Sequence, residues 1–189
     1  MKKIIFTLVL AFAAINLMAQ EHLSFKGIPI EGSMTEFCKK IKEKGFISIG
    51  SENNITLFTG DFTGRNATVG VTATDDGKNV FAVAVFFDPS GEWNTLVNTY
   101  DYYKDLYTRK YGKPTISKEK NPAYSVSNTA LLAEVHQGTV VYASAWEVTG
   151  GDIQLSIEKS SGVYEGMVMI RYRDSQNVET KIQNDLDEI

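Results

Sequence analysis

Residues 67–93 read ATVGVTATDDGKNVFAVAVFFDPSGEW, and this stretch decides the fold class. Apolar residues alternate with threonine and glycine over Ala67–Thr74, a pattern typical of a strand with one buried face. Asp75-Asp76-Gly77-Lys78 favours a tight hairpin turn. The next run, Val80–Phe87, is apolar on both faces and predicts a more deeply buried strand. Two such strands joined by a tight turn indicate an antiparallel sheet.

A helix is expected directly after this hairpin. Asp88 or Ser90 can cap its first turn, and Pro89 fits there because the first helical N–H groups have no partner within the helix. Gly112 ends the helix, which therefore covers residues 92–111. Its apolar stripe consists of Trp93, Leu96, Val97, Tyr100, Tyr107 and Tyr111.

The residues before this stretch show the same order of elements. Ser33 and Glu36 form a capping box at the start of a helix that Gly45 ends. Two strands, Phe46–Ile49 and Ile55–Phe62, then lead to the hairpin. The apolar face of the helix includes Cys38, the only cysteine of the chain, so we expect a packed core residue and no disulfide.

Beyond the second helix, residues 117–128 are expected to form a polar, mobile loop. Four further strands follow, predicted at Ala130–His136, Val140–Val148, Asp152–Glu158 and Tyr164–Tyr172. The polar tail, residues 175–189, is expected to be either a short helix or disordered.

The predicted fold class is α+β, with a single domain over residues 20–174. Residues 27–88 and 89–174 each form a unit in which one helix is followed by about four antiparallel strands. The two α-β-β-β-β units are either a tandem repeat or an accidental symmetry, and the residues leave both alternatives open.

Residues 1–19 have the pattern of a cleavable secretory signal peptide. Lys2 and Lys3 precede an apolar run to Ile15, which is shorter than the roughly 20 residues that span a bilayer. Cleavage after Ala19 would leave Gln20 as the new amino terminus. We therefore expect export to the periplasm or the extracellular space, without a stable membrane anchor.

The charge of the mature chain argues against one class of partner. Residues 20–189 carry 17 basic and 23 acidic residues, a net charge of −6. Affinity for nucleic acids comes largely from basic side chains that neutralise phosphates. We therefore expect no nucleic-acid partner.

Several short motifs resemble known secreted proteins. Gly27-Ile28-Pro29-Ile30-Glu31-Gly32, Phe37, Lys44-Gly45-Phe46 and Tyr111-Gly112-Lys113-Pro114 are similar to motifs of uncharacterised secreted or periplasmic proteins of Bacteroidetes, as is the Ala19-Gln20 junction. That resemblance implies no known activity. The order of helices and strands also resembles the architecture of the β-lactamase inhibitor protein, which is a likeness of fold alone.

We recognise no catalytic set, cofactor motif or metal-ligand cluster in the sequence. The two histidines are far apart, with His22 expected to be exposed near the new amino terminus and His136 at the end of a strand. Carboxylates are the exception, because glycoside hydrolysis needs only two of them. Glu134, Glu147 and Glu158 fall in predicted strands, so a carboxylate-dependent hydrolase acting on a polysaccharide or peptide is the alternative function.

Aromatic residues suggest a binding surface. Tyr102 and Tyr103 fall away from, or at the edge of, the apolar stripe of the second helix, where tyrosine suits an interface. In the strand Val140–Val148, Tyr142 and Trp146 share one face, and the small residues Val141, Ala143 and Ala145 share the other. We expect the helix to cover the small face, which leaves the aromatic face either for a partner or for packing against the first unit.

The sequence therefore favours an exported, non-enzymatic domain that binds a protein or a small ligand through a sheet face. Its speculative binding residues are Tyr142, Trp146, Tyr102 and Tyr103.

Overall fold

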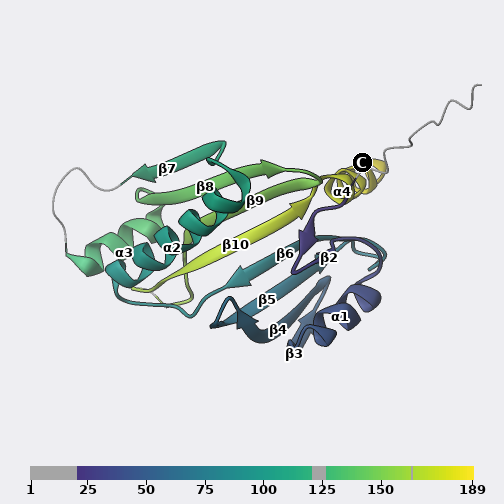
Figure 1. The fold of residues 1–189 in the computed structure, drawn as a ribbon, viewed down its shortest axis with the longest axis horizontal. Coiled ribbons are helices and arrows are strands. Elements are labelled where there is room, and N and C mark those ends of the chain that lie inside the picture. Colours follow the sequence, from purple (N-terminus) through teal and green to yellow (C-terminus); the bar gives the residue numbers. More distant parts are fainter. Residues whose placement is uncertain (1–20, 121–126, 163) are drawn as a thin grey trace, which may run out of the picture.

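The computed structural model describes residues 21–120, 127–162 and 164–189. Its main element is an antiparallel sheet of eight strands in the order β3-β4-β5-β6-β10-β9-β8-β7 (Figure 1). The bounds of these strands are β3 Ile47–Glu52, β4 Ile55–Phe62, β5 Arg65–Ala73, β6 Val80–Phe86, β7 Ile116–Lys120, β8 Val141–Val148, β9 Gly151–Lys159 and β10 Gly166–Asp174. The α+β class and the antiparallel sheet predicted from the sequence are confirmed.

Three helices and a small hairpin pack on one face of this sheet. The helix α1 (Met34–Glu43) contacts β5, α2 (Trp93–Tyr111) contacts β8, β9 and β10, and α3 (Asn128–Gln137) contacts β9 (Figure 1). The hairpin of β1 (Ser24–Phe25) and β2 (Ile28–Pro29) brings Phe25 into the same core. No helix in the described part of the chain is long and apolar enough to cross a bilayer.

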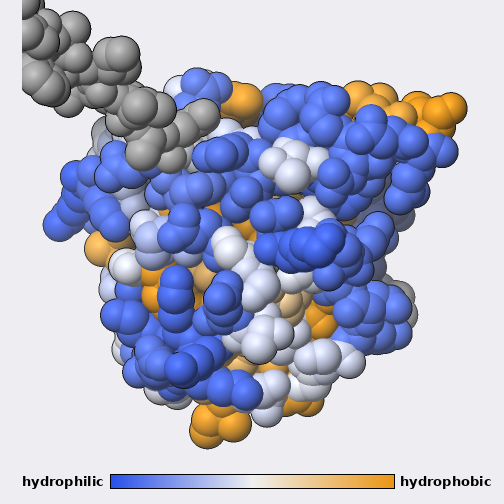
Figure 2. All heavy atoms as spheres, turned by 90° about the vertical axis from the view of Figure 1, so that its right-hand side faces the viewer, coloured by the Kyte–Doolittle hydropathy of each residue, from blue (hydrophilic) through white to orange (hydrophobic). Residues whose placement is uncertain are grey.

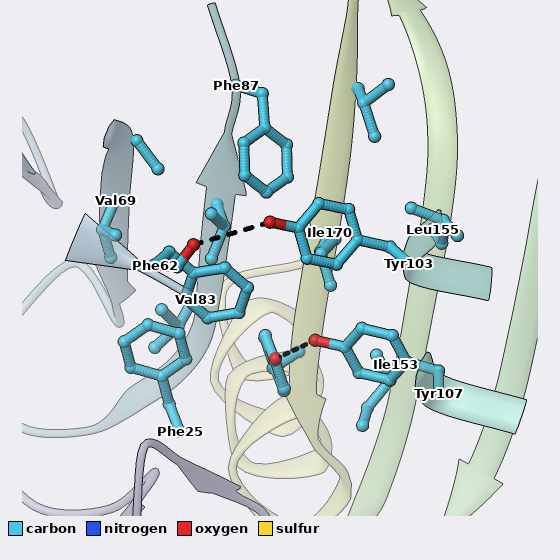
Figure 3. Packing of buried hydrophobic residues seen from close by; sticks show 14 of the residues in the cluster. Phe25, Phe62, Val69, Val83, Phe87, Tyr103, Tyr107, Ile153, Leu155 and Ile170 are labelled. Carbon is cyan, nitrogen blue, oxygen red and sulfur yellow. Dashed lines mark hydrogen bonds between the residues drawn. The ribbon is translucent and has the colours of Figure 1, made fainter. Parts of the chain in front are cut away.

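The core is a layer of aromatic and branched side chains between these elements and the sheet. Phe25 stacks on Phe62 with ring centroids 5.9 Å apart, and Phe87 stacks on Tyr103 at 4.6 Å. Figure 3 shows Tyr103 and Tyr107 reaching from α2 toward these phenylalanines and β10. Both halves of the chain therefore contribute to one continuous core.

The strand predicted at Ala130–His136 is wrong, because these residues belong to α3. The Ser127 side chain accepts a hydrogen bond from the backbone N–H of Ala130, and Gly138 ends the helix in the left-handed conformation. Leu132 and Val135 are the residues that α3 buries. Alanine and leucine dominate this segment and favour a helix, a preference that the strand prediction overlooked.

The polar loop predicted over residues 117–128 is also corrected in part. Residues 116–120 form β7, which pairs with β8 from Ile116 to Lys120 at the edge of the sheet. Residues 121–126 lie outside the described part of the chain, as do the predicted signal peptide and Gln20.

The polar tail forms the helix α4 (Ser175–Asp187), which contacts β6, β9 and β10. Asp174 caps the helix, and it is fully buried. The Nδ2 atom of Asn177 donates hydrogen bonds to the carbonyl oxygens of Ile30 and Val80, both at 2.9 Å. Figure 2 shows the end of the molecule on the α4 side, where small groups of hydrophobic residues are scattered among hydrophilic ones.

We expect Asn177→Ala to lower the free energy of unfolding by about 2 kcal/mol, because two buried carbonyl groups lose their donor. Urea unfolding followed by circular dichroism measures this change. The control is Asn184→Ala on the exposed side of α4, which should stay within about 0.5 kcal/mol of the wild type. Equal effects of both substitutions would contradict the role of Asn177.

Candidate functional site

The sheet has a second face, opposite α1, α2 and α3, which we call the open face. The strand registers place Leu57, Gly70, Ala84 and Arg171 in one row across this face, from β4 to β10. The neighbouring row on one side contains Thr59, Thr68, Phe86 and Met169, and the row on the other side contains Ile55, Thr72, Ala82 and Arg173. These residues come from both halves of the chain, which meet where β6 pairs with β10.

The open face carries exposed apolar side chains near β3 and β4. Ile55 is 40% exposed and Leu57 is 37% exposed, whereas buried strands normally hide such residues. Ile47 and Ile49 on the adjacent edge strand are more exposed still, at 68% and 55%. Exposed apolar residues that are grouped in this way mark interaction sites more often than singly scattered ones.

A hollow of about 460 Å³ lies within this apolar area. Gly70 forms its floor, since a Cβ atom added there would lie 3.4 Å from Phe86 Cε2 and 3.5 Å from Leu57 Cδ2. Ile55 and Ala84 complete the apolar lining, and Glu52 is the one charged residue that lines it. We call this feature the Gly70 hollow. Its size and lining suit an apolar side chain of a partner.

One cation lies beside the hollow. Arg171 is the cross-strand neighbour of Ala84, about 5 Å away between the strands. Its Nη2 atom lies 3.7 Å from the sulfur of Met169, and among the described residues no carboxylate lies within 4.0 Å of its guanidinium. Arg173, two residues further along, is paired with Asp152 at 3.0 Å. Arg171 is therefore the guanidinium of this face that is available to an acidic group.

The two edge strands of the sheet differ in how well they are protected against pairing with another chain. Every residue of both edge strands, β3 and β7, is exposed. β7 carries Lys118, Glu119 and Lys120, and charged residues of this kind discourage pairing with another chain. β3 instead presents Ile47 and Ile49 and is irregular between Ser48 and Gly50. The apolar end of the open face thus continues to the less protected edge.

The helix α2 covers the face of the strand Val140–Val148 opposite to the one we expected. Tyr142 and Trp146 lie on the face covered by α2, where Trp146 is 1% exposed and its ring centroid lies 5.5 Å from that of Tyr107. Tyr142 makes edge contacts with Trp93 and Tyr100, at 5.3 and 5.4 Å. The small residues Ala143 and Ala145 lie on the open face instead. The helix covers the aromatic face because its own tyrosines and these rings fill the space between helix and sheet together.

Of the other two predicted binding residues, one is exposed. Tyr103 is fully buried and shares a hydrogen bond of 2.8 Å with the hydroxyl of Thr63. Tyr102 is 44% exposed and lies under the guanidinium of Arg65, 5.3 Å from its ring centroid. The four predicted residues therefore do not form a common surface.

The candidate carboxylates do not converge. Glu134 lies on α3, and Glu147 and Glu158 lie on β8 and β9. Glu147 faces Asp152 across the strands, and Glu158 is six residues further along β9, which is about 20 Å. Paired acids of glycosidases lie within about 10 Å of each other. The pair of Glu147 and Glu158 therefore gives the hydrolase alternative no support.

Other predicted reactive groups occupy structural positions. His22 is not freely exposed, because its Nδ1 atom lies 3.0 Å from the buried carboxylate of Asp174. His136 on α3 contacts the carbonyl oxygen of Glu165 at 2.9 Å. Cys38 is half-buried and packs against the core, and burial raises the pKa of its thiol. No group of three His, Cys, Asp or Glu side chains among the described residues could hold a metal ion.

One signal for the open face is visible in the sequence, the alternation of Ile55, Leu57 and Thr59 with the buried Phe58. No such signal marks Arg171, which joins the hollow only through the pairing of β6 with β10. No family model, curated protein or solved structure matches this chain.

Proposed function

We propose that this chain is an exported binding domain that docks another protein on the open face of its sheet. The observation that carries the proposal is the exposed apolar Gly70 hollow on a face that α1, α2 and α3 leave free. Export to the periplasm or the extracellular space follows from the signal-peptide pattern of residues 1–19.

The chemistry of the face suggests the kind of partner. The hollow accommodates one large apolar side chain. Arg171 lies beside it, and no carboxylate of the described residues lies within 4.0 Å of its guanidinium. Buried apolar anchors and arginines contribute most of the energy at many protein interfaces. The partner we propose therefore presents a protruding loop with a large apolar residue next to an Asp or Glu.

The arrangement of the sheet supports a related proposal on its origin. Each half contributes a helix and four strands. From the edge of the sheet to the β6–β10 pair, the strands follow in chain order in both halves, β3-β4-β5-β6 in the first and β7-β8-β9-β10 in the second. We propose that the halves are copies of one α-β-β-β-β unit, although only the second half has the additional helix α3.

Site-specific photo-crosslinking in the expressing cells tests the docking proposal. A photoreactive residue at Thr59 on the open face should capture a protein that the same residue at Asp101, exposed on α2, does not capture. The captured protein is then purified, and its affinity is measured by calorimetry. We expect Leu57→Asp to weaken binding about 30-fold, as for a central interface residue, because a carboxylate replaces an apolar side chain that lines the hollow.

The matched control is Ile182→Asp on α4. It replaces an apolar side chain that is 45% exposed, similar to Leu57, by the same carboxylate. It should leave the affinity unchanged. Equal capture from Asp101, or an unaffected Leu57→Asp variant, would refute the docking proposal. Capture of a second copy of this chain alone would assign the face to self-association and refute a different protein as the partner.

A further inference from the structure

A second cavity, of about 630 Å³, lies on the helix side of the sheet. It is a groove open to solvent, lined by the second half of α2, the β1–β2 hairpin, the β4–β5 turn and the β8–β9 turn. Four tyrosines line it, and we call it the tyrosine groove: Tyr103, Tyr107, Tyr111 and Tyr172. Its lining shares no residue with the Gly70 hollow.

Three of the four tyrosines are largely covered. Tyr103 is fully buried, and Tyr107 and Tyr172 are 8% and 6% exposed, whereas Tyr111 is half-buried. The hydroxyl of Tyr107 is hydrogen-bonded to that of Tyr172, and the hydroxyl of Tyr103 is bonded to Thr63 (Figure 3 draws the first of these bonds). Tyr111 stacks on Tyr107 with centroids 5.9 Å apart. The inner hydroxyls are already paired, and the half-buried side chains of Leu106, Tyr111 and Val148 also line the groove. These side chains offer an apolar ligand dispersion contacts.

Two lysines line the groove, Lys26 and Lys110. Lys26 donates a hydrogen bond of 3.0 Å to the carbonyl oxygen of Asp61, and its Nζ atom lies 5.1 Å from the ring centroid of Phe46. The Nζ atom of Lys110 lies 4.8 Å from the ring centroid of Tyr111. Within the described ranges, neither lysine has a carboxylate within 4.0 Å, so both charges are free to pair with an anion.

Besides the lysines and the tyrosines, two titratable residues line the groove, Glu21 and His22. Glu21 is exposed and contributes one negative charge. His22 is held by the carboxylates of Asp174, at 3.0 Å, and Glu31, at 3.6 Å, so its imidazole is already engaged. The two unpaired lysines thus outnumber the one free acid, and the groove favours an anionic headgroup.

We propose that the tyrosine groove binds a single-chain amphiphile, with its apolar tail against Leu106, Tyr111 and Val148 and its anionic headgroup at Lys26 and Lys110. The volume lies within the range of about 300 to 1,000 Å³ that is usual for ligand sites. The headgroup is a carboxylate or a phosphate, and the source is either a free fatty acid or a lipid fragment. This site is independent of the protein-docking proposal.

The test uses the mature chain and the fluorescent aromatic sulfonate 1-anilinonaphthalene-8-sulfonate as the probe. We expect one probe molecule to bind per chain and dodecanoate, below its micellar concentration, to displace it. Dodecyltrimethylammonium has the same tail and a positive headgroup, and it should compete about tenfold less well. Comparison of dodecanoate with dodecyl phosphate separates a fatty-acid ligand from a phosphorylated lipid fragment.

The double variant Lys26→Glu/Lys110→Glu should bind dodecanoate about tenfold more weakly, because the charges of both lysines that line the groove are reversed. The matched control is Lys39→Glu/Lys40→Glu, which makes the same change at exposed positions of α1 and should bind as the wild type does. Leu57→Asp, in the Gly70 hollow, should also leave probe binding intact. Circular dichroism confirms that each variant is folded.

Three results would overturn the proposal. The first is equal competition by the anionic and cationic dodecyl compounds. The second is unchanged affinity in Lys26→Glu/Lys110→Glu, and the third is loss of probe binding in Leu57→Asp, which would place the probe on the open face.

Discussion

Replacing Trp146 by alanine is expected to lower the free energy of unfolding by about 4 kcal/mol, which is typical of removing a buried tryptophan. Trp146 is 1% exposed beneath α2 and contacts the ring of Tyr107. Its Nε1–H group donates a hydrogen bond of 3.0 Å to the carbonyl oxygen of Gly112, at the end of α2. The substitution therefore removes both a large apolar contact and the donor that fixes the end of the helix.

Urea unfolding followed by far-UV circular dichroism measures this loss. Trp146→Phe retains part of the ring volume but not the donor, and we expect it to cost about half as much. Ala143→Ser on the open face of the same strand serves as the control and should change stability by less than about 0.5 kcal/mol. A loss below about 1 kcal/mol in Trp146→Ala would contradict the buried position.

The position of Trp146 also shows where sequence reasoning fails. Alternation correctly separated Tyr142 and Trp146 from Ala143 and Ala145, because side chains of a strand point to opposite faces. It could not decide which set the helix covers. That choice depends on how the tyrosines of α2 pack against the side chains of the strand. The pattern of the strand alone does not contain this information.

Local signals predicted several boundaries, although the cap expected from Asp88 or Ser90 is wrong, because α2 begins after Glu92 without a side-chain cap. The capping box of Ser33 and Glu36 is present at the start of α1, and β4 has the predicted bounds Ile55–Phe62. The tight turn at Gly77 also occurs as expected, with a positive φ of 69°. Each of these features is fixed by residues a few positions apart, which a single sequence contains.

The candidate sites depend instead on contacts between distant residues. Arg171 lies beside the Gly70 hollow because β10 pairs with β6, and the tyrosine groove forms where residues of the β1–β2 hairpin and of α2 line the same cavity. Nothing in the spacing of these residues specifies the partners of their strands. The open face and the groove therefore emerge only from the three-dimensional arrangement.

We further expect the protein to unfold cooperatively in alkaline solution, at roughly pH 11 to 13, because its core tyrosines resist ionisation. Burial raises the pKa of Tyr107 and Tyr172 well above the ordinary value of 10.0, and the neighbouring hydroxyl of Tyr172 raises that of Tyr107 further. Burial likewise raises the pKa of Tyr100, and the carboxylate of Glu119 adds to this effect. Tyr103 shifts in the same direction through burial.

The sign of the pH dependence follows from the direction of these shifts. Below about pH 10 the phenols are protonated in both the folded and the unfolded chain, so their contribution to stability is constant. Above that pH the unfolded chain loses these protons and the folded chain keeps them. Each such group then costs about 1.4 kcal/mol per pH unit, so Tyr100, Tyr107 and Tyr172 together remove about 4 kcal/mol per unit.

Absorbance at 295 nm measures the ionisation of tyrosine, and far-UV circular dichroism measures unfolding. The core tyrosines should ionise at the pH at which the circular dichroism signal is lost. The double variant Tyr107→Phe/Tyr172→Phe removes both partners of one hydroxyl pair, so we expect little change of stability at neutral pH. Its stability should fall by only about 1.4 kcal/mol per pH unit above pH 10, because Tyr100 remains as the strongly shifted group. Unfolding at the same pH in the variant and the wild type, or ionisation of all tyrosines while the circular dichroism signal is still intact, would show that these phenols do not govern the alkaline transition.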